Sequence, residues 1–370
     1  MSDSQELTML NALELFHYSS RFRGHLFVLV LESDVNLKEI MSDIRVIHGS
    51  HIEIILVCYR TPKLENFVEE WNKRGFEFEY FKNVVSTSYD AGQIDLELER
   101  AREGKVTVID LMDDAEEKDL LTLDSYVLHL CNQWDVDKLF FLSMRKGLTI
   151  NGHSYSHLTT KEAESQLAGC EEINITKKRF SQIVEEQKKD GCDVVFLESN
   201  SGYLFEEIFT HRGKGTLLTN DYSNEIRMGL LSDVFDISLL MKSYIKAGYI
   251  LPVSEDQLAK DIDAYFVYSV NGFLVAAAKL NDYGDASELA KFCTLPRYQG
   301  RGRAKKLAHD MIEKARDSGK HYVFALSIDP RMWRFFEGLG FKECDREKLP
   351  EQWKSRYNFS RPSKAFQLLL

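Results

Sequence analysis

The run Gln299-Gly300-Arg301-Gly302-Arg303-Ala304, followed by Lys305, has the composition of an anion-binding turn. Glycines let the backbone approach a ligand, and the N–H groups entering the amphipathic helix that follows would point at it, aided by the helix dipole. Arg301, Arg303 and Lys305 add positive charge. The pattern predicts a site for a pyrophosphate, and an ordinary strand-to-helix turn is the alternative.

The elements around this turn follow a distinctive order. An Asn-Gly pair at 271–272 between two strand-like runs predicts a two-residue hairpin. The sequence predicts helices at 233–248 and about 255–264, strands at 265–270, 273–280 and 287–295, the glycine turn with its helix, a strand at 321–327, a helix at 332–341 and a strand at 366–370.

The first 220 residues alternate continuous apolar runs with amphipathic patterns, which predicts a mostly parallel sheet covered by helices on both faces. Strands are expected at 25–31, 53–60, 105–111, 137–143 and 192–198. Helices are expected at 36–47, 63–74, 92–103, 115–133, 160–168 and 179–190. The first strand runs into LESDVNL without a glycine, so no nucleotide phosphate loop is predicted in this half.

Charge and composition divide the chain and exclude several classes of function. A turn-rich stretch at 211–225 predicts two domains, 1–220 and 221–370. The net charge of −11 argues against nucleic-acid binding, yet residues from Asp221 onward carry +3 and the earlier ones −14. The more basic second half suits an anionic ligand.

No membrane span, metal site or disulfide framework is expected. No apolar run reaches the roughly 18 to 20 residues that a span needs, and the start has no targeting pattern, which indicates a cytoplasmic protein. The six cysteines lie far apart without a CxxC pair, which indicates reduced thiols.

The glycine turn and the later string FFEGLGF (335–341) together resemble the acetyl-CoA signature of the GNAT-type N-acetyltransferases. The resemblance implies acetyl-CoA as co-substrate, with its pyrophosphate on the turn from Gln299 to Lys305. It also implies that the strand residues Phe292, Cys293 and Thr294 pair with the pantetheine arm.

Longer stretches of the sequence make the resemblance more specific. ELAKFCTLPRYQGRGRAKKL (288–307) and LPEQWKSRYNFSRPSK (349–364) resemble the acetyltransferase domain of N-acetylglutamate synthases, and YLFEEIFTHRGKGTLL (203–218) resembles their amino-acid-kinase segment. The implied fold class is α/β: a reduced, degenerate amino-acid-kinase-like αβα sandwich with a regulatory or oligomerisation role, followed by a GNAT domain. A homo-oligomer without kinase activity is expected.

Acetyl transfer to an amine needs a base, an oxyanion donor and an acid for the leaving thiolate. The resemblance implies Glu288 as the base, acting directly or through water; an edge-strand surface carboxylate is the alternative. A backbone N–H near Lys291 and Phe292, in a bulged part of the strand, would bind the oxyanion. Ser327 is the candidate acid, and a serine that caps the next helix is the alternative.

Substrate recognition departs from the family. Val253 stands where the synthases carry an arginine for the substrate carboxylates. Arg361 and Ser363 match the family's R-x-S element, and Lys291 could supply a compensating charge, although a lysine lying along the strand surface is the alternative.

An L-arginine effector site is also implied. Its matching positions are Phe16 and Tyr18 near the N-terminus, with Glu207 and Gly213 in the EIFTHRG segment. An acidic side chain there could pair with a guanidinium. Core aromatics and a helix-surface glutamate are the alternatives.

Three functions follow from these observations. The first is acetylation of the α-amine of an amino acid, L-glutamate in the first place, by direct attack in a ternary complex, which is the first step of arginine biosynthesis. The second keeps the enzyme class and changes the amine, because of Val253. The third is a non-catalytic regulatory subunit that senses acetyl-CoA or arginine.

Overall fold

The computed structural model describes residues 12, 14–32, 34–59, 63–84, 91–112, 120–189, 191–210, 213–220, 224–270 and 272–370. The chain forms two compact units, unit 1 (Met1–Asn220) and unit 2 (Asp221–Leu370). No helix in the described part of the chain combines the length and apolar character needed to cross a membrane.

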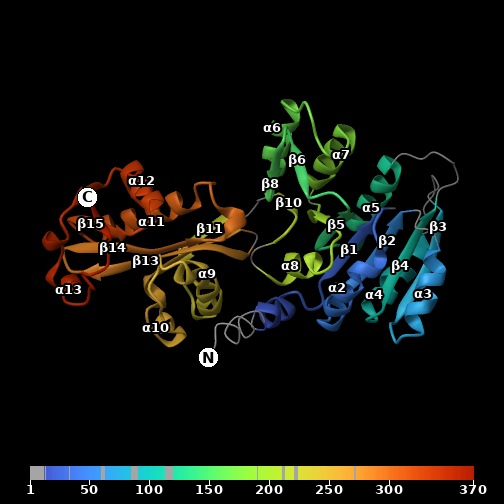
Figure 1. Ribbon diagram of the computed structural model, residues 1–370, viewed down its shortest axis with the longest axis horizontal. Helices are drawn as coiled ribbons and strands as arrows, with labels where there is room; N and C mark the ends of the chain where they lie inside the picture. Colours follow the sequence, from blue (N-terminus) through green and yellow to red (C-terminus); the bar gives the residue numbers. More distant parts are fainter. Residues whose placement is uncertain are drawn as a thin grey trace. The chain divides into compact units, whose positions relative to one another are not determined.

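Unit 1 is built on an eight-stranded sheet with the order β3-β4-β2-β1-β5-β9-β10-β8 (Figure 1). Its strands are β1 (Leu26–Leu31), β2 (Glu53–Tyr59), β3 (Phe78–Val84), β4 (Val106–Met112), β5 (Lys138–Ser143), β8 (His157–Thr159), β9 (Asp193–Glu198) and β10 (Thr216–Thr219). Strands from β3 to β9 are parallel, and β10 runs antiparallel to β9. The five predicted strands are present within one residue at either end; β6 (Leu148–Ile150) and β7 (His153–Tyr155) form a separate small hairpin.

Helices cover both faces of this sheet. They are α2 (Leu37–Gly49), α3 (Leu64–Asn72), α4 (Ala91–Arg102), α5 (Leu120–Trp134), α6 (Thr160–Ala168), α7 (Lys177–Gln187) and α8 (Tyr203–Phe209). All six residues of β1 are buried, and Val28 and Val30 share a core with residues of α5 and α7. Their neighbours in the strand must face the other side, where Figure 1 shows α2 and α8. The first residues of the helix expected at 115–133 lie outside the described part.

A buried ion cluster lies at the carboxyl ends of the central strands of unit 1. Arg179 on α7 binds Asp124 on α5, and its Nη1 donates to Glu32 Oε1 at 2.6 Å, just after β1. Tyr59, the last residue of β2, donates to Asp124 Oδ1 at 3.0 Å. Arg179 and Asp124 are 3% and 0% exposed. In open parallel sheets this edge is where ligands usually bind, and here the chain's own side chains occupy it.

Unit 2 is a seven-stranded sheet with the order β11-β12-β13-β14-β15-β17-β16. Its strands are β11 (Asn224–Met228), β12 (Tyr265–Val270), β13 (Phe273–Tyr283), β14 (Ala286–Thr294), β15 (Tyr322–Ser327), β16 (Lys342–Cys344) and β17 (Lys364–Leu369). Its helices are α9 (Val234–Lys246), α10 (Glu255–Lys260), α11 (Arg303–Asp317), α12 (Pro330–Gly338) and α13 (Glu351–Lys354). The predicted hairpin joins β12 and β13: Val270 pairs with Phe273 and Gly272 has a φ of +75°, whereas Asn271 lies outside the described residues.

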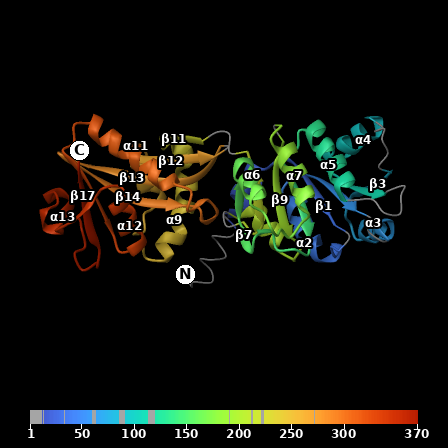
Figure 2. The same cartoon turned by 90° about the horizontal axis from the view of Figure 1, so that it is seen from above.

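The two faces of this sheet carry different helices. Ala277 packs in a core with Ile237 and Met241 of α9, whereas its neighbours Ala276 and Ala278 pack in another with Leu307 and Met311 of α11 and with residues of α12. Figure 1 shows α9 on one side of the sheet and α11 with α12 on the other, and Figure 2 shows the same unit from above. The small alanines let the helices of both layers approach β13 closely.

Strands β14 and β15 pair over only part of their length. They are the one parallel pair of this sheet, and their pairing runs from Ala286 with Tyr322 to Glu288 with Phe324. Beyond Glu288 each strand stays paired on its outer edge, β14 with β13 and β15 with β17. The two strands therefore separate and leave a gap within the sheet.

We predict that Arg179→Met lowers the stability of the protein by about 3–5 kcal/mol, because Asp124 and Glu32 would lose a buried partner. Chemical denaturation followed by circular dichroism measures the change. The matched control is Lys178→Met, a neighbouring exposed position on the same helix, which should stay near the wild-type value. Equal stability of the two variants would contradict a structural role for the cluster.

Candidate functional site

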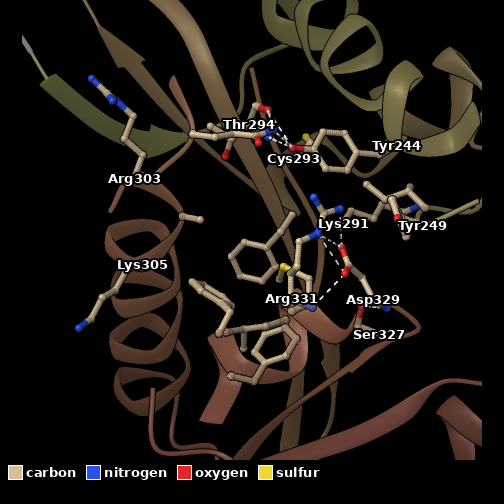
Figure 3. A pocket seen from close by; sticks show the side chains of 18 of the residues that line it. Tyr244, Tyr249, Lys291, Cys293, Thr294, Arg303, Lys305, Ser327, Asp329 and Arg331 are labelled. Carbon is tan, nitrogen blue, oxygen red and sulfur yellow. Dashed lines mark hydrogen bonds and ion pairs between the residues drawn. The ribbon is translucent and has the colours of Figure 1, made fainter. Parts of the chain in front are cut away.

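A cavity of about 410 Å³ occupies the gap between β14 and β15. Its walls come from β14, the turn before α11, the end of β15, the start of α12, and Tyr244 of α9 with the loop that follows that helix (Figure 3). The cavity therefore collects residues that lie up to nearly a hundred positions apart in the sequence. In the described part of the chain, no group of three or more His, Cys, Asp or Glu side chains is arranged to hold a metal ion.

A β-bulge bends β14 where it lines the cavity. Ala277 pairs with Cys293 but Lys279 pairs with Ala290, so β14 has an extra residue at this point. Lys291 adopts a left-handed φ of +54°, which is uncommon outside glycine. Sequence reasoning expected a bulge near Lys291 and Phe292, and the register confirms it.

The glycine turn presents backbone N–H groups to the cavity. Gly300 and Gly302 have φ of +76° and +74°, a conformation that side chains with a Cβ rarely adopt. Gly302 is the N-cap of α11 and provides no capping side chain, so the first N–H groups of α11 point into the cavity end. This is the geometry that binds phosphate groups at helix N-termini.

The positive side chains of the turn contribute less directly to the cavity than the backbone N–H groups do. The Arg303 guanidinium stacks over Tyr298 and Tyr268, at 5.0 and 5.8 Å from the ring centroids. Figure 3 shows the Arg303 and Lys305 side chains extending away from the other residues drawn. Nine of the ten residues predicted to bind the co-substrate line the cavity, and Arg301 does not. Arg303 and Lys305 therefore reach the cavity through their backbones.

Glu288 lies at the point where the two strands separate, outside the lining of the cavity. It is half-buried, and its Oε2 accepts hydrogen bonds from Asn281 Nδ2 at 2.9 Å and from the Tyr283 hydroxyl at 3.5 Å. Burial raises the pKa of Glu288, against the lowering effect of hydrogen bonds from Asn281 and Trp353. A raised pKa brings a carboxylate closer to the proton affinity that a general base needs.

Ser327 lines the cavity at the end of β15. Its Oγ accepts the N–H of Asp329 at 3.0 Å, and its carbonyl accepts Trp333 Nε1 at 2.8 Å. Asp329 in turn caps α12 by accepting the N–H of Arg331 at 2.9 Å. The serine thus supports the start of α12 while its hydroxyl group lies at the cavity.

Two predicted substrate cations converge on the loop between α9 and α10. Lys291 Nζ donates to the Leu251 carbonyl at 3.3 Å, and burial lowers the pKa of Lys291. Arg361 Nη2 donates to the carbonyls of Gly248 and Tyr249 at 2.7 and 2.9 Å. Both cations are therefore positioned by backbone carbonyls, which carry no net charge.

Lys291 lines the cavity, whereas Arg361 and the other predicted substrate positions do not. Ser363 is 8% exposed and hydrogen-bonds the Tyr357 hydroxyl, and neither residue lines the cavity. Val253 packs against the hydrophobic core under α9. The valine that replaces the family's arginine is thus part of a hydrophobic contact.

Sequence reasoning missed several cavity residues, among them Tyr244 and Arg331. The Tyr244 hydroxyl donates to the Thr294 carbonyl at 2.8 Å. Arg331 is paired with Asp329 and lies 5.5 Å from the centroid of the Tyr249 ring. Tyr244 sits in an amphipathic helical pattern and Arg331 in the first turn of α12, so the sequence carried no signal for either.

Residues 233–341 match the acetyltransferase (GNAT) family. Unit 2 is a GNAT acetyltransferase domain. Its split between β14 and β15, the bulge and the open turn before α11 are the parts of this domain that form the cavity.

The chain is also similar to proteins named amino-acid acetyltransferase. The one from Pasteurella multocida is 28% identical over 252 residues, which cover 66% of this chain and 57% of that protein. The one from Mannheimia succiniciproducens is 30% identical over 197 residues, covering 52% of this chain and 44% of that protein. The chain thus spans about half the length of the curated relatives that it matches.

A crystal structure of N-acetylglutamate synthase from Neisseria gonorrhoeae, complexed with coenzyme A and L-arginine, shares the fold of this chain. The TM-score is 0.62 at 19% identity, covering 96% of this chain and 98% of that one. Together with the GNAT match, this confirms the predicted α/β fold class, an αβα sandwich followed by a GNAT domain.

Cys293 lies in the wall of the GNAT cavity but is unsuited to nucleophilic catalysis. Burial raises the pKa of its thiol to about 12, and the Sγ donates to the Ala277 carbonyl at 3.5 Å. Only the thiolate is a good nucleophile. This favours direct attack of an amine over an acetyl-cysteine intermediate.

The predicted effector residues of unit 1 have different surroundings. Phe16 is 73% exposed, whereas Tyr18 stacks on Phe22 with ring centroids 6.0 Å apart. Glu207 on α8 is 7% exposed, and its Oε2 accepts the N–H groups of Lys214 and Gly215. The carboxylate thus stabilises the turn before β10, in which Gly213 has a φ of +60°.

Proposed function

We propose that this protein transfers the acetyl group of acetyl-CoA to the α-amine of an amino acid, L-glutamate in the first place, to form N-acetylglutamate, the first step of arginine biosynthesis. The observation that carries the proposal is the cavity between β14 and β15, which combines a bulged strand edge with an uncapped helix N-terminus in a GNAT domain. The names of the amino-acid acetyltransferase relatives support the choice of substrate class.

Acetyl-CoA would lie along the cavity in one orientation, with its pyrophosphate at the turn before α11 and its thioester at the bulge of β14. The N–H groups of Gly302 to Lys305 would hold the pyrophosphate, and the edge of β14 at Thr294 would run beside the pantetheine arm. The thioester would then lie at the bulge, where the N–H of Phe292 can donate to the oxyanion that forms during attack. The Neisseria synthase, which has the same fold, was crystallised with coenzyme A.

The reaction would proceed in a ternary complex. Glu288 removes a proton from the substrate ammonium through a water molecule, since its carboxylate lies outside the cavity lining. The free amine attacks the thioester carbon, the C–N bond forms, and the C–S bond breaks. Ser327, at the cavity end of β15, would donate a proton to the departing thiolate. Lys291, which lines the cavity, and Arg361, which contacts the same loop between α9 and α10, would attract a substrate carboxylate.

We expect Glu288→Gln to reduce kcat by at least about 100-fold, the usual contribution of a general base. In the wild type, kcat/KM should rise with pH through the raised pKa of Glu288, because only the carboxylate accepts a proton. The variant should lose this dependence. Release of free thiol from acetyl-CoA, measured across a pH series, provides both values.

The matched control for this test is Glu343→Gln, which removes a carboxylate on β16 that pairs with Lys364 at the surface. It should keep the wild-type rate and pH profile. If Glu288→Gln behaves like this control, Glu288 is not the base.

A second candidate function is acetylation of a different amine. It is favoured by the hydrophobic packing of Val253, which leaves no cation at the position where one was expected for a substrate carboxylate.

An acceptor panel separates the two candidates. Purified protein with acetyl-CoA is offered L-glutamate, L-aspartate, L-glutamine, L-lysine and spermidine, and products are identified by mass spectrometry. We expect the highest kcat/KM with L-glutamate. Turnover with another amine and none with glutamate would instead establish the second candidate. Coenzyme binding without turnover of any amine would indicate a regulatory subunit.

We further propose that unit 1 is a degenerate amino-acid-kinase-like domain with a regulatory or oligomerisation role, and that residues 1–220 and 221–370 are separate domains of a cytoplasmic homo-oligomer. The absence of a glycine after β1 and the ion cluster beside it support the loss of kinase chemistry. The presence of L-arginine in the Neisseria structure supports arginine as the effector.

L-arginine should raise the melting temperature of the protein, because a ligand that binds only the folded state stabilises it. Thermal denaturation at increasing L-arginine concentration measures this shift, and D-arginine at equal concentration controls for general solvent effects. An identical response to both enantiomers would argue against a specific effector site.

A further inference from the structure

The edge of β14 that faces the cavity already makes hydrogen bonds to side chains of this protein. On the opposite edge, the Leu295 N–H donates to the Val275 carbonyl of β13 at 2.9 Å. Because successive residues of a strand direct their N–H and C=O groups to opposite edges, both groups of Thr294 point away from β13. They therefore face the gap from which β15 has separated.

The hydroxyl group of Tyr244 satisfies both of these backbone groups. It donates to the Thr294 carbonyl at 2.8 Å and accepts the Thr294 N–H at 3.1 Å. Gln299 Nε2 donates to the same hydroxyl at 3.0 Å and to the Thr294 carbonyl at 3.1 Å. Figure 3 shows the Tyr244 ring directed at Thr294. The phenol thus closes a hydrogen-bonded cluster on the strand edge.

A backbone N–H has a single hydrogen, so Thr294 cannot donate fully to the phenol and to a ligand at once. An extended ligand that carries amide groups binds a free strand edge as an added strand would. The pantetheine arm has two amides and would run along this edge from the turn before α11 to the bulge. The Tyr244 hydroxyl stands in its path at Thr294.

We propose that Tyr244 is a gate in the coenzyme groove: its hydroxyl pairs with Thr294 while the groove is empty and gives up this place when the pantetheine arm enters. The inference rests on the proposed use of acetyl-CoA. Tyr244 contacts β14 two residues beyond Phe292, on the side of the turn, so it acts on the middle of the arm and is distinct from the acid at the thiolate.

The gate makes the empty protein more stable and coenzyme binding weaker. In Tyr244→Phe the ring remains but the competing hydroxyl is gone, so coenzyme A should bind about 3- to 10-fold more tightly, the equivalent of one typical hydrogen bond. Adenosine 3′,5′-bisphosphate lacks the pantetheine arm, and its affinity should be the same in the variant and the wild type. Isothermal titration calorimetry on the full chain measures both ligands.

Thermal denaturation provides a second measurement. The empty Tyr244→Phe protein should melt at a lower temperature than the empty wild type, and saturation with coenzyme A should remove most of this difference. Tyr322→Phe is the matched control, since it loses the same hydroxyl from β15 of this sheet at a position outside the cavity. Its affinity for both ligands should equal that of the wild type.

The outcomes separate the gate from the proposed function. Unchanged or weaker coenzyme A binding by Tyr244→Phe, with the wild type binding normally, overturns the gate and leaves acetyl-CoA use intact. Equal tightening for the bisphosphate also overturns it, because the effect would not concern the arm. A wild-type protein that binds neither ligand overturns the proposed function and the gate with it.

Discussion

The short pairing between β14 and β15 is the constraint on which unit 2 depends. Two neighbouring parallel strands would normally continue side by side, but these two share only the positions from Ala286 to Glu288 on β14. The bulge at Lys291 bends β14, while β17 keeps all six residues of β15 paired. Each strand is thus held on its outer edge, while beyond Glu288 the inner edges do not pair with each other.

In unit 1, charged side chains fill the carboxyl ends of the central strands of the sheet. The carboxyl ends of its central strands meet Arg179, Asp124 and Glu32, which satisfy one another in a nearly water-free place. Burial raises the pKa of Asp124 in spite of Arg179. These side chains lie at the carboxyl ends of β1 and β2. One sheet is opened by a bulge, and the other is filled by charges.

The sequence predicted elements whose pattern is local and missed those that depend on distant partners. Continuous apolar runs identified the five central strands of unit 1, because burial on both faces requires them. β11 was not predicted, and its first two residues fell in the stretch read as a linker. Its residues are exposed or half-exposed, and in the described part of the chain it pairs with β12 alone. The edge strand β3 and the short β16 were missed for similar reasons.

In the site, too, local features could be predicted and contacts with distant elements could not. The glycines and the strand before them predicted the turn, and the resemblance to the GNAT-type acetyltransferases implied the bulge. The environment of Glu288 depends on Trp353 and the contact of Thr294 depends on Tyr244, and both partners come from elements far away in the sequence. Charged residues were identified by type, yet the sequence could not tell that Lys291 and Arg361 contact loop carbonyls or that the Arg303 side chain stacks on aromatic rings.

The carbonyl contacts of Lys291 and Arg361 have an electrostatic consequence. A carboxylate partner would cancel most of the field of a cation, whereas a carbonyl dipole fixes its direction and leaves its charge in place. The carbonyl contacts therefore leave the charges of Lys291 and Arg361 in place at the loop between α9 and α10. An anionic ligand would be attracted to this loop before it makes any contact, and added salt would slow its association by shortening the reach of the field.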